Sequence, residues 1–424
     1  MSRSLLTGNA AAAWGARLAR ADYLPAFPIT PQTEILETLG RWIEAGELDA
    51  RLVVLESEHS MLTAAAAAAA TGVRVFTATS SQGLLYAMEM IYTVAGWRAP
   101  FVLVNVSRAL ASPITLEPDH NDVLAARDSG FLQIHAATCQ EVLDGVLLAC
   151  RLGEDPRVRL PALVNLDGFQ LSFTREPVEI PEPEVVDAFL PPFDPGSLGF
   201  RASRPISQAV AVLGGGSYSY FRYEMQRAQE SALAAWEEIA AEFRGRFGRS
   251  WEPVECYRAD DAEIVFVMIG SFATQAKGAV DRLRESGERV GLVRPRLLRP
   301  YPAEALRCAL AGKRGVAVID QNLAPGKGGV LHAELCSVLH GHRDAPAVVT
   351  SFVGGLGGRD IGAEEFYEMA AATRRAGGAS RPPEPRLLYT AGELREVRKL
   401  QAVARAERGA TTGAPLPRPE VGEA

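Results

Sequence analysis

Short apolar runs, rich in β-branched residues, alternate with helical segments through the first 185 residues of the chain. Such runs are typical of strands that are covered on both faces of a sheet. Because about one helix separates each strand from the next, the connections have the length of parallel crossovers. The pattern therefore predicts a doubly wound α/β domain. We expect strands at 23–27, 52–55, 73–78, 101–106, 131–135 and 162–166, and helices at 9–20, 33–45, 59–70, 82–95 and 140–152.

A second series of the same kind begins after residue 258, so the predicted fold class is α/β with two doubly wound domains. In this series we expect strands at 264–268, 290–293, 316–319 and 347–352, and helices at 274–285, 303–311, 330–339 and 363–371.

The segment between the two series has a different character. Residues 176–206 are proline-rich and acidic, which indicates an extended linker or arm, and a long charged helix is expected at 223–247. Residues 405–424 are rich in Ala, Gly, Pro and Thr, and we predict a disordered tail there. We therefore expect a first domain (1–185), a linker with the long helix (186–258), a second domain (259–375) and a partly disordered C-terminal extension (376–424).

Composition and charge narrow the possible partners. Apolar residues make up 47% of the 424, which is enough for large cores. The net charge of −7 argues against nucleic acid as the main partner, because phosphate binding needs a basic face. There is no run of about 18 apolar residues to cross a membrane, and the first residues lack the apolar core of a signal peptide. We expect a cytoplasmic protein that does not bind membranes.

The sequence contains few residues in patterns that could bind a metal. Its five cysteines are scattered, and no two are spaced as C-x-x-C, which excludes a local iron–sulfur or zinc motif. If the protein takes part in electron transfer, the clusters lie on another chain. Asp119, His120 and Asp122 could bind a cation, but the polarity of an ordinary loop explains them as well, and we predict no metal site.

Glu58 is the strongest candidate for a functional residue. It follows the expected strand 52–55 and begins an alanine-rich helix, and the carboxyl ends of parallel strands are where such folds build ligand sites. A carboxyl group beside a buried nitrogen heterocycle can share a proton with a ring nitrogen. The alternative is an acid in the first turn of a helix, where Glu56 or Glu58 only interacts with the helix dipole.

Other strand ends contribute polar groups to the same crevice. Thr30 lies between Pro28 and Pro31, which stiffen its loop, and a rigid hydroxyl suits a substrate carboxylate. Arg108 can grip a carboxylate with its planar fork. Residues 80–83 place small groups and a glycine where a flat ring could approach the backbone. Each has a plainer alternative: a helix cap for Thr30, a surface salt bridge for Arg108 and an N-cap for residues 80–83.

Taken in order, the motifs of the chain resemble those of the alpha subunit of 2-oxoacid:ferredoxin oxidoreductases, most of all the pyruvate:ferredoxin branch. The resemblance covers about residues 7–375. The motifs are FPITPQTE (27–34), LESEHS (55–60), RVFTATSSQGL (74–84), VSRAL (106–110), DHND (119–122), AARDSGF (125–131), VNLDGF (164–169), LVRPRLLRPYPAEAL (292–306), VIDQNLAPGKGG (318–329) and GGLGGRDI (354–361).

The resemblance implies a thiamine diphosphate pyrimidine-binding domain followed by a transketolase C-terminal-like domain. It implies reversible oxidative decarboxylation of pyruvate with coenzyme A to acetyl-CoA and CO2, with electrons passing to ferredoxin. Thiamine diphosphate would be shared with a diphosphate-binding beta subunit. Mg2+ and the iron–sulfur clusters would lie on partner subunits, which include gamma and ferredoxin-like delta chains. The absence of a Gly-Asp-Gly motif followed by Asn-Asn in this chain agrees with that division.

Carried over motif by motif, the resemblance implies that Glu58 contacts the aminopyrimidine. Thr30 and Arg108 would hold the carboxylate of the 2-oxoacid. The remaining cofactor contacts would come from Pro28, Ile29, Ser81 and Gln82.

The chain departs from the pyruvate branch in one loop. Residues 111–118 lack the aromatic side chain expected in pyruvate-specific relatives. A homologous subunit for a bulkier 2-oxoacid, such as 2-oxoisovalerate or phenylglyoxylate, is therefore an open alternative, and so is a non-catalytic supporting subunit.

Overall fold

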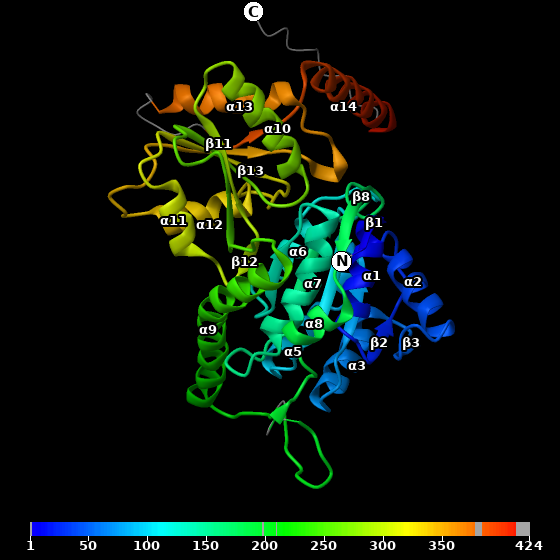
Figure 1. Cartoon of the computed structure of the whole chain (residues 1–424). Helices are drawn as coiled ribbons and strands as arrows, with labels where there is room; N and C mark the ends of the chain where they lie inside the picture. The colour runs from blue at the N-terminus through cyan, green and yellow to red at the C-terminus, as the bar shows by residue number, and fades with distance from the viewer. Residues whose placement is uncertain (1, 197–198, 209, 378–383, 413–424) are drawn as a thin grey trace, which may run out of the picture. The chain divides into compact units, whose positions relative to one another are not determined.

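The structure is a computed structural model that describes residues 2–196, 199–208, 210–377 and 384–412. The chain forms two units, Met1–Pro385 and Arg386–Ala424. The first unit holds both large sheets and their helices (Figure 1). The second contains the short strand β15 (Arg386–Leu387) and the helix α14 (Ala391–Thr412).

Helix α14 corrects part of the predicted disordered tail. Residues 405–408 continue a run of strong helix formers, so the helix extends through them to Thr412. Residues 413–424 of the predicted tail lie outside the described residues.

The first sheet has the strand order β12-β6-β7-β5-β4, and a bridge between Tyr23 and Val75 continues it into the pair β2–β3. All neighbours run parallel except β12, which is antiparallel to β6. This arrangement confirms the predicted doubly wound architecture. The strands are β2 (Tyr23–Ala26), β3 (Arg51–Val54), β4 (Phe76–Thr79), β5 (Val102–Ser107), β6 (Leu132–His135), β7 (Ala162–Asp167) and β12 (Leu297–Arg299).

The second sheet contains the order β14-β13-β10-β11-β9, with only β9 antiparallel. Its central strands are fully buried and, apart from Asp320 at the end of β13, apolar, as expected for strands covered on both faces. The strands are β9 (Val254–Tyr257), β10 (Ile264–Val267), β11 (Val290–Pro295), β13 (Gly315–Asp320) and β14 (Val349–Val353).

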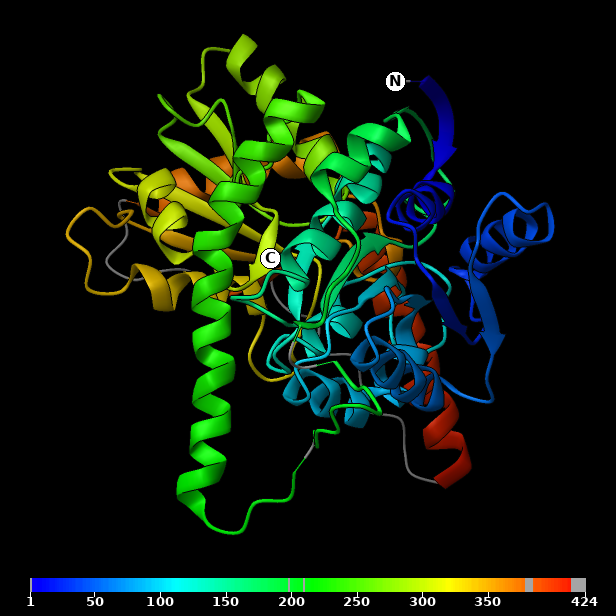
Figure 2. The same cartoon turned by 60° about the horizontal axis from the view of Figure 1, so that its bottom comes forward.

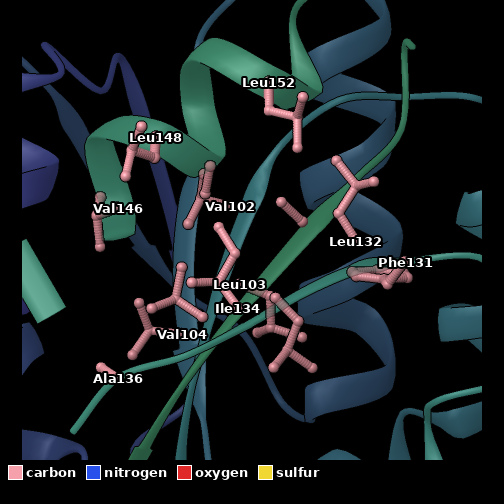
Figure 3. Packing of buried hydrophobic residues seen from close by; sticks show 14 of the residues in the cluster. Val102, Leu103, Val104, Phe131, Leu132, Ile134, Ala136, Val146, Leu148 and Leu152 are labelled. Carbon is pink, nitrogen blue, oxygen red and sulfur yellow. The ribbon is translucent and has the colours of Figure 1, made fainter. Parts of the chain in front are cut away.

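Helices cover the sheets, and their apolar faces form the core. Val146, Leu148 and Leu152 of α7 lie over the apolar side chains of β5 and β6 (Figure 3). The helices are α1 (Gly8–Leu18), α2 (Thr33–Glu44), α3 (Glu58–Ala70), α4 (Ser81–Tyr86), α5 (Met88–Gly96), α6 (Asn121–Ala125), α7 (Cys139–Gly153), α8 (Pro183–Phe189), α9 (Gly215–Phe247), α10 (Phe272–Glu285), α11 (Ala303–Leu310), α12 (Val330–Leu339), the 3-10 turn η2 (Leu356–Gly358) and α13 (Ala363–Ala376).

The predicted helix at 82–95 and the predicted linker both differ from the structure. The helix is divided at Ala87 into α4 and α5. In the linker, β8 (Arg175–Ile180) pairs antiparallel with β1 (Ser2–Thr7) at the N-terminus, and α8 follows. Val178 and Ile180 are buried while Pro177 and Glu179 are exposed, which is the alternation of a half-buried strand.

The two sheets are joined by one continuous stretch of chain. Strand β11 ends at Pro295 in the second sheet, and β12 begins at Leu297 in the first, where Leu297 pairs with Ile134 of β6. A strand that lies in sequence between two strands of the second sheet, β11 and β13, therefore forms an edge of the first sheet. None of the helices that the structure describes has the length and apolar character needed to cross a membrane.

Candidate functional site

The loops that carry the candidate residues leave the carboxyl ends of β2, β3, β4 and β5. These strands lie side by side in the order β3-β2-β4-β5 and run parallel, so their carboxyl ends meet at one edge of the sheet. That edge is where open α/β sheets bind ligands.

Glu58 is the first residue of α3, but it does not cap the helix. Ser57 does so, because its hydroxyl accepts a hydrogen bond from the Ser60 amide at 3.2 Å. The exposed Glu56 accepts from the Ser60 hydroxyl instead. Glu58 itself is 4% exposed and accepts no hydrogen bond from the residues that the structure describes. Glu58 thus lies in the first turn of α3, as the plainer alternative requires, but the cap is Ser57 and the Glu58 carboxylate accepts no hydrogen bond from the described residues.

Gly83 makes room for the Glu58 carboxylate. A Cβ atom at Gly83 would lie 2.4 Å from Glu58 Oε1 and 2.6 Å from Thr79 Oγ1, so a side chain there would displace the Glu58 carboxylate. The hydroxyls of Thr79 and Ser80 are buried and have no hydrogen-bond partner among the described parts of the chain. We call Glu58, Gly83, Thr79 and Ser80 the cradle. A buried polar atom without a partner costs free energy, so the cradle offers hydrogen-bond acceptors and donors to a bound group.

Arg108 lies beside this cradle. It is 8% exposed, and its Nη1 donates to the Thr30 carbonyl at 2.7 Å while its Nη2 donates to Gln82 Oε1 at 3.0 Å. Its Nε is buried without a partner in the described structure. Burial lowers the pKa of Arg108 from its ordinary value, and the nearby Asp122 carboxylate opposes that shift. The guanidinium is thus held by neutral oxygens, and no carboxylate forms a salt bridge with it among the described residues.

The structure brings Thr30, Gln82 and Arg108 together by these bonds, and Gln82 also adjoins Gly83 in sequence. The Thr30 side chain is exposed, and it is the carbonyl that receives Arg108. On the same loop Pro28 is exposed and Ile29 half-buried.

Ser81 has a different orientation from the one that a pocket-lining residue would take. It is fully buried, and its hydroxyl lies 2.7 Å from Gln82 Oε1 and 3.1 Å from the Ala109 carbonyl, both of which are acceptors. Its backbone φ is +47°, a conformation that residues other than glycine rarely adopt.

Sequence reasoning missed the importance of Asp122. Asp122 is one of the three candidate cation ligands named above, but the described residues contain no group of three acidic, His or Cys side chains placed to hold a metal. Instead, its buried carboxylate accepts hydrogen bonds from the Ser81 and Arg108 backbone amides and from Asn105. Burial raises the pKa of Asp122 to about 6. The motif DHND held the only sequence signal, because two acids and a histidine follow a strand-end loop.

Two family models match the chain. The model described as pyruvate flavodoxin/ferredoxin oxidoreductase, thiamine diphosphate-binding, matches residues 14–243. The model for pyruvate:ferredoxin oxidoreductase core domain II matches residues 262–366.

Relatives of known name cover most of the chain. The pyruvate synthase subunit PorA of Methanothermobacter thermautotrophicus is 42% identical over 373 residues, which are 88% of this chain and 96% of that protein. The ketoisovalerate oxidoreductase subunit VorA of Pyrococcus abyssi is 40% identical over 369 residues, which are 87% of this chain and 92% of that protein.

A solved structure shares the fold. The 2-oxoglutarate:ferredoxin oxidoreductase of Magnetococcus marinus aligns with a TM-score of 0.66 at 19% identity, and the alignment covers 88% of this chain and 65% of that one. Together with the two family models, the relatives confirm the resemblance to the alpha subunit of 2-oxoacid:ferredoxin oxidoreductases: the chain belongs to the pyruvate flavodoxin/ferredoxin oxidoreductase family.

Proposed function

We propose that this chain is the alpha subunit of a thiamine diphosphate-dependent pyruvate:ferredoxin oxidoreductase, and that it supplies the pyrimidine half of the cofactor site. The observation that carries the proposal is the buried carboxylate of Glu58, which has no hydrogen-bond donor among the described residues. It lies so close to Gly83 that a side chain at this position would displace it.

The residues fit a flat heteroaromatic ring. Glu58 supplies a carboxyl group, Gly83 leaves the backbone open, and the unpaired hydroxyls of Thr79 and Ser80 offer further hydrogen bonds. Thiamine diphosphate, when bound, supplies the electron sink for decarboxylation. Glu58 would hold a proton at a ring nitrogen, and Pro28, Ile29, Ser81 and Gln82 would form the surrounding loops.

Arg108 would orient the 2-oxoacid by its carboxylate. The guanidinium has no acidic partner to compete with a substrate among the described residues, and its buried Nε has a free proton. The loops of Thr30 and Gln82 fix two of its nitrogens, so the fork is pre-organised. Thr30 would add its exposed hydroxyl to the same carboxylate.

The remaining parts of the reaction would come from partner chains. The relatives of this chain carry the name of a subunit, which supports a multi-chain enzyme. We assign the diphosphate and Mg2+ site to a beta subunit, and the iron–sulfur clusters to gamma and ferredoxin-like delta subunits or their equivalents. Ferredoxin would accept the electrons and coenzyme A the acyl group.

A bulkier 2-oxoacid is the second candidate substrate. It is favoured by the VorA relative, which is nearly as similar as PorA, and by the loop 111–118, which has no aromatic residue and exposes 78% of Ile114. Reduction of viologen by the assembled enzyme with pyruvate, 2-oxoisovalerate and phenylglyoxylate decides between them, because the true substrate gives the highest kcat/KM.

The central test is Glu58→Gln in the complex with its partner chains. The variant keeps the shape of the side chain but cannot share a proton, so we expect pyruvate-dependent viologen reduction to fall about 100-fold or more. Glu56→Gln is the matched control: this exposed acid lies two residues earlier, and its replacement should leave the rate near that of the wild type. Unchanged turnover in Glu58→Gln would instead favour a non-catalytic supporting subunit.

A further inference from the structure

Asp122 connects the two loops that carry the candidate site. Its Oδ2 lies 3.0 Å from the Ser81 amide, 3.3 Å from the Arg108 amide and 3.1 Å from Asn105 Nδ2. Its Oδ1 accepts from the Val123 amide at 2.6 Å. Ser81 leaves β4 and Arg108 leaves β5, so one carboxylate joins the ends of two neighbouring strands through their backbones.

These bonds hold a backbone that would not otherwise keep its shape. Ser81 has a φ of +47°, which costs free energy in a residue with a Cβ and persists only where the surroundings impose it. The Ser81 amide donates a hydrogen bond to the Asp122 carboxylate. The carboxylate is fully buried, so the donors around it also offset the cost of its own desolvation.

The segment that carries Asp122 is fixed by the second half of the chain. His120 is fully buried and its Nε2 lies 2.6 Å from Asp167 Oδ1, while Asp167 Oδ2 accepts from the Ser271 amide at 2.7 Å and from its hydroxyl at 2.6 Å. The His120 amide also donates to the Gln321 carbonyl at 2.8 Å.

A further contact supports the same segment. The Asn121 side chain accepts a hydrogen bond from the Leu323 amide at 3.2 Å. Ser271 is the N-cap residue of α10, and residues 321–323 follow β13, so both supports come from loops of the second sheet. Residues 120–122 therefore touch the second sheet's loops on one side and the candidate site on the other.

We propose that Asp122 is a positioning residue for substrate binding: it fixes the backbone at Ser81 and Arg108, and thereby sets where the Arg108 guanidinium meets the carboxylate of the 2-oxoacid. The inference rests on the proposed function, in which Arg108 binds that carboxylate. Asp122 itself touches neither substrate nor cofactor.

The test uses the enzyme assembled with its partner chains and the variant Asp122→Asn. The amide keeps the size of the side chain but turns an NH2 group toward backbone donors. We expect the KM for the 2-oxoacid to rise about tenfold or more, with a smaller change in kcat, because a misplaced guanidinium weakens substrate binding. The Kd of oxamate, an unreactive carboxylate of pyruvate's shape, should rise in parallel when measured by calorimetry.

A double-mutant cycle with Arg108→Ala separates positioning from general support of the fold. If Asp122 acts through Arg108, then Asp122→Asn should weaken oxamate binding in the wild-type background and add little once Arg108 is gone. Asp144→Asn is the control. Asp144 lies on α7 and is almost as buried as Asp122, but its partner is Arg249, which is far in sequence from the loops of Ser81 and Arg108. It should lower the melting temperature without changing the Kd of oxamate.

The outcomes test the role of Arg108 and the role of Asp122 separately. If Arg108→Ala leaves oxamate binding unchanged, the assigned role of Arg108 in the proposed function is wrong. If Arg108→Ala weakens binding and Asp122→Asn does not, or if the two effects add, the positioning role is wrong. Should Asp122→Asn fail to assemble, Asp122→Glu keeps the charge with a longer side chain and is expected to show the same rise in KM.

Discussion

Gly83 is the position where one added carbon atom would disturb the candidate site most directly. A Cβ there would lie 2.4 Å from Glu58 Oε1, so Gly83→Ala must push the Glu58 carboxylate away. We expect viologen reduction to fall about tenfold or more, since small misplacements of a reacting group are costly. Gly40→Ala is the control: nothing lies within 4 Å of its added Cβ in α2, and it should raise stability by about 1 kcal/mol without loss of rate. Equal rates for Gly83→Ala and wild type would contradict the proposal that Gly83 makes room for the Glu58 carboxylate.

His135 should make the stability of the protein fall at acid pH. It is fully buried at the end of β6, and neither ring nitrogen has a partner in the described structure. Burial, followed by the neighbouring His120, lowers its pKa to about 3, with Asp167 opposing and Arg294 and Arg299 adding to the shift.

The sign follows from the two pKa values of His135. Between about pH 3 and 6.5 the unfolded chain binds a proton that the folded chain refuses, so stability decreases as pH falls through 6.5. From pH 7 to 5.5 the wild type should lose about 1 kcal/mol relative to His135→Gln. Denaturant unfolding of both proteins at the two pH values measures this, and a difference that does not change with pH would show that His135 takes up its proton in the fold.

Single residues differ in how far their sequence context revealed them. Glu58 could be selected as a candidate from the sequence, because it follows a strand and begins a helix, and its role in ligand binding stays a prediction. The hydrogen bonds of Asp122 could not be predicted, because its partners are the backbone amides of Ser81 and Arg108. Backbone donors leave no trace in a pattern of side chains, so its role emerges only from the folded chain.

At the scale of elements, a buried contact joins the middle of α9 to the segment that follows it. Trp236 is fully buried, its Nε1 donates to the Trp251 carbonyl at 2.8 Å, and the two rings meet edge to face at 6.3 Å. Trp236→Ala should cost about 3–5 kcal/mol of unfolding free energy through the cavity it leaves. Tyr218→Ala on the same helix, where the side chain is 57% exposed, should change stability by less than about 0.5 kcal/mol. Calorimetry of both variants tests this, and a similar loss in each would contradict the assignment of the core.

The same helix shows what periodicity can and cannot predict. The predicted start at residue 223 lies close to Met225, where the buried stripe begins. The helix itself starts at Gly215, and residues 215–224 are exposed on every side; Figure 2 shows these first turns standing clear of both sheets. A segment without a buried face has no apolar period to detect. Strand β8 was missed for another reason: its partner β1 lies at the far end of the domain in sequence.

At the scale of the whole molecule, the two sheets are coupled by a strand and by a buried ion cluster. Strand β12 falls within the predicted second domain (259–375) but belongs to the first sheet. Nothing in a three-residue segment such as Leu-Leu-Arg indicates which sheet it joins, so the predicted domain boundaries stay a prediction.

Arg294 is the charge at the centre of this coupling. It is fully buried in β11, and its Nη2 lies 2.5 Å from Glu141 Oε1 of α7 while its Nε lies 2.7 Å from Glu255 Oε2 of β9. Burial by itself would raise the pKa of Glu255, but Arg294 and its neighbours bring that pKa down to about 2. The ion pair therefore contributes stability that is present above about pH 4.5 and is lost as pH falls toward 2.

Replacing Arg294 by methionine removes the most buried cation beside Glu141 and Glu255. It leaves Glu141 with Arg296, and Glu255 with Arg296 and Lys277, both of which are more exposed. We expect a loss of about 3 kcal/mol or more at pH 7, because removing one partner of a buried ion pair uncovers the desolvation cost of the other. Glu141→Gln and Glu255→Gln in the same chain should restore part of that loss, since neutral amides need no counter-charge. Arg282→Met, at an exposed position of α10, is the control and should be nearly neutral.

Because Arg294 bonds to elements of both halves, the loss should appear as a downward shift of one calorimetric transition. A separate, unshifted transition for either half would show that the sheets unfold independently and that this cluster does not join them.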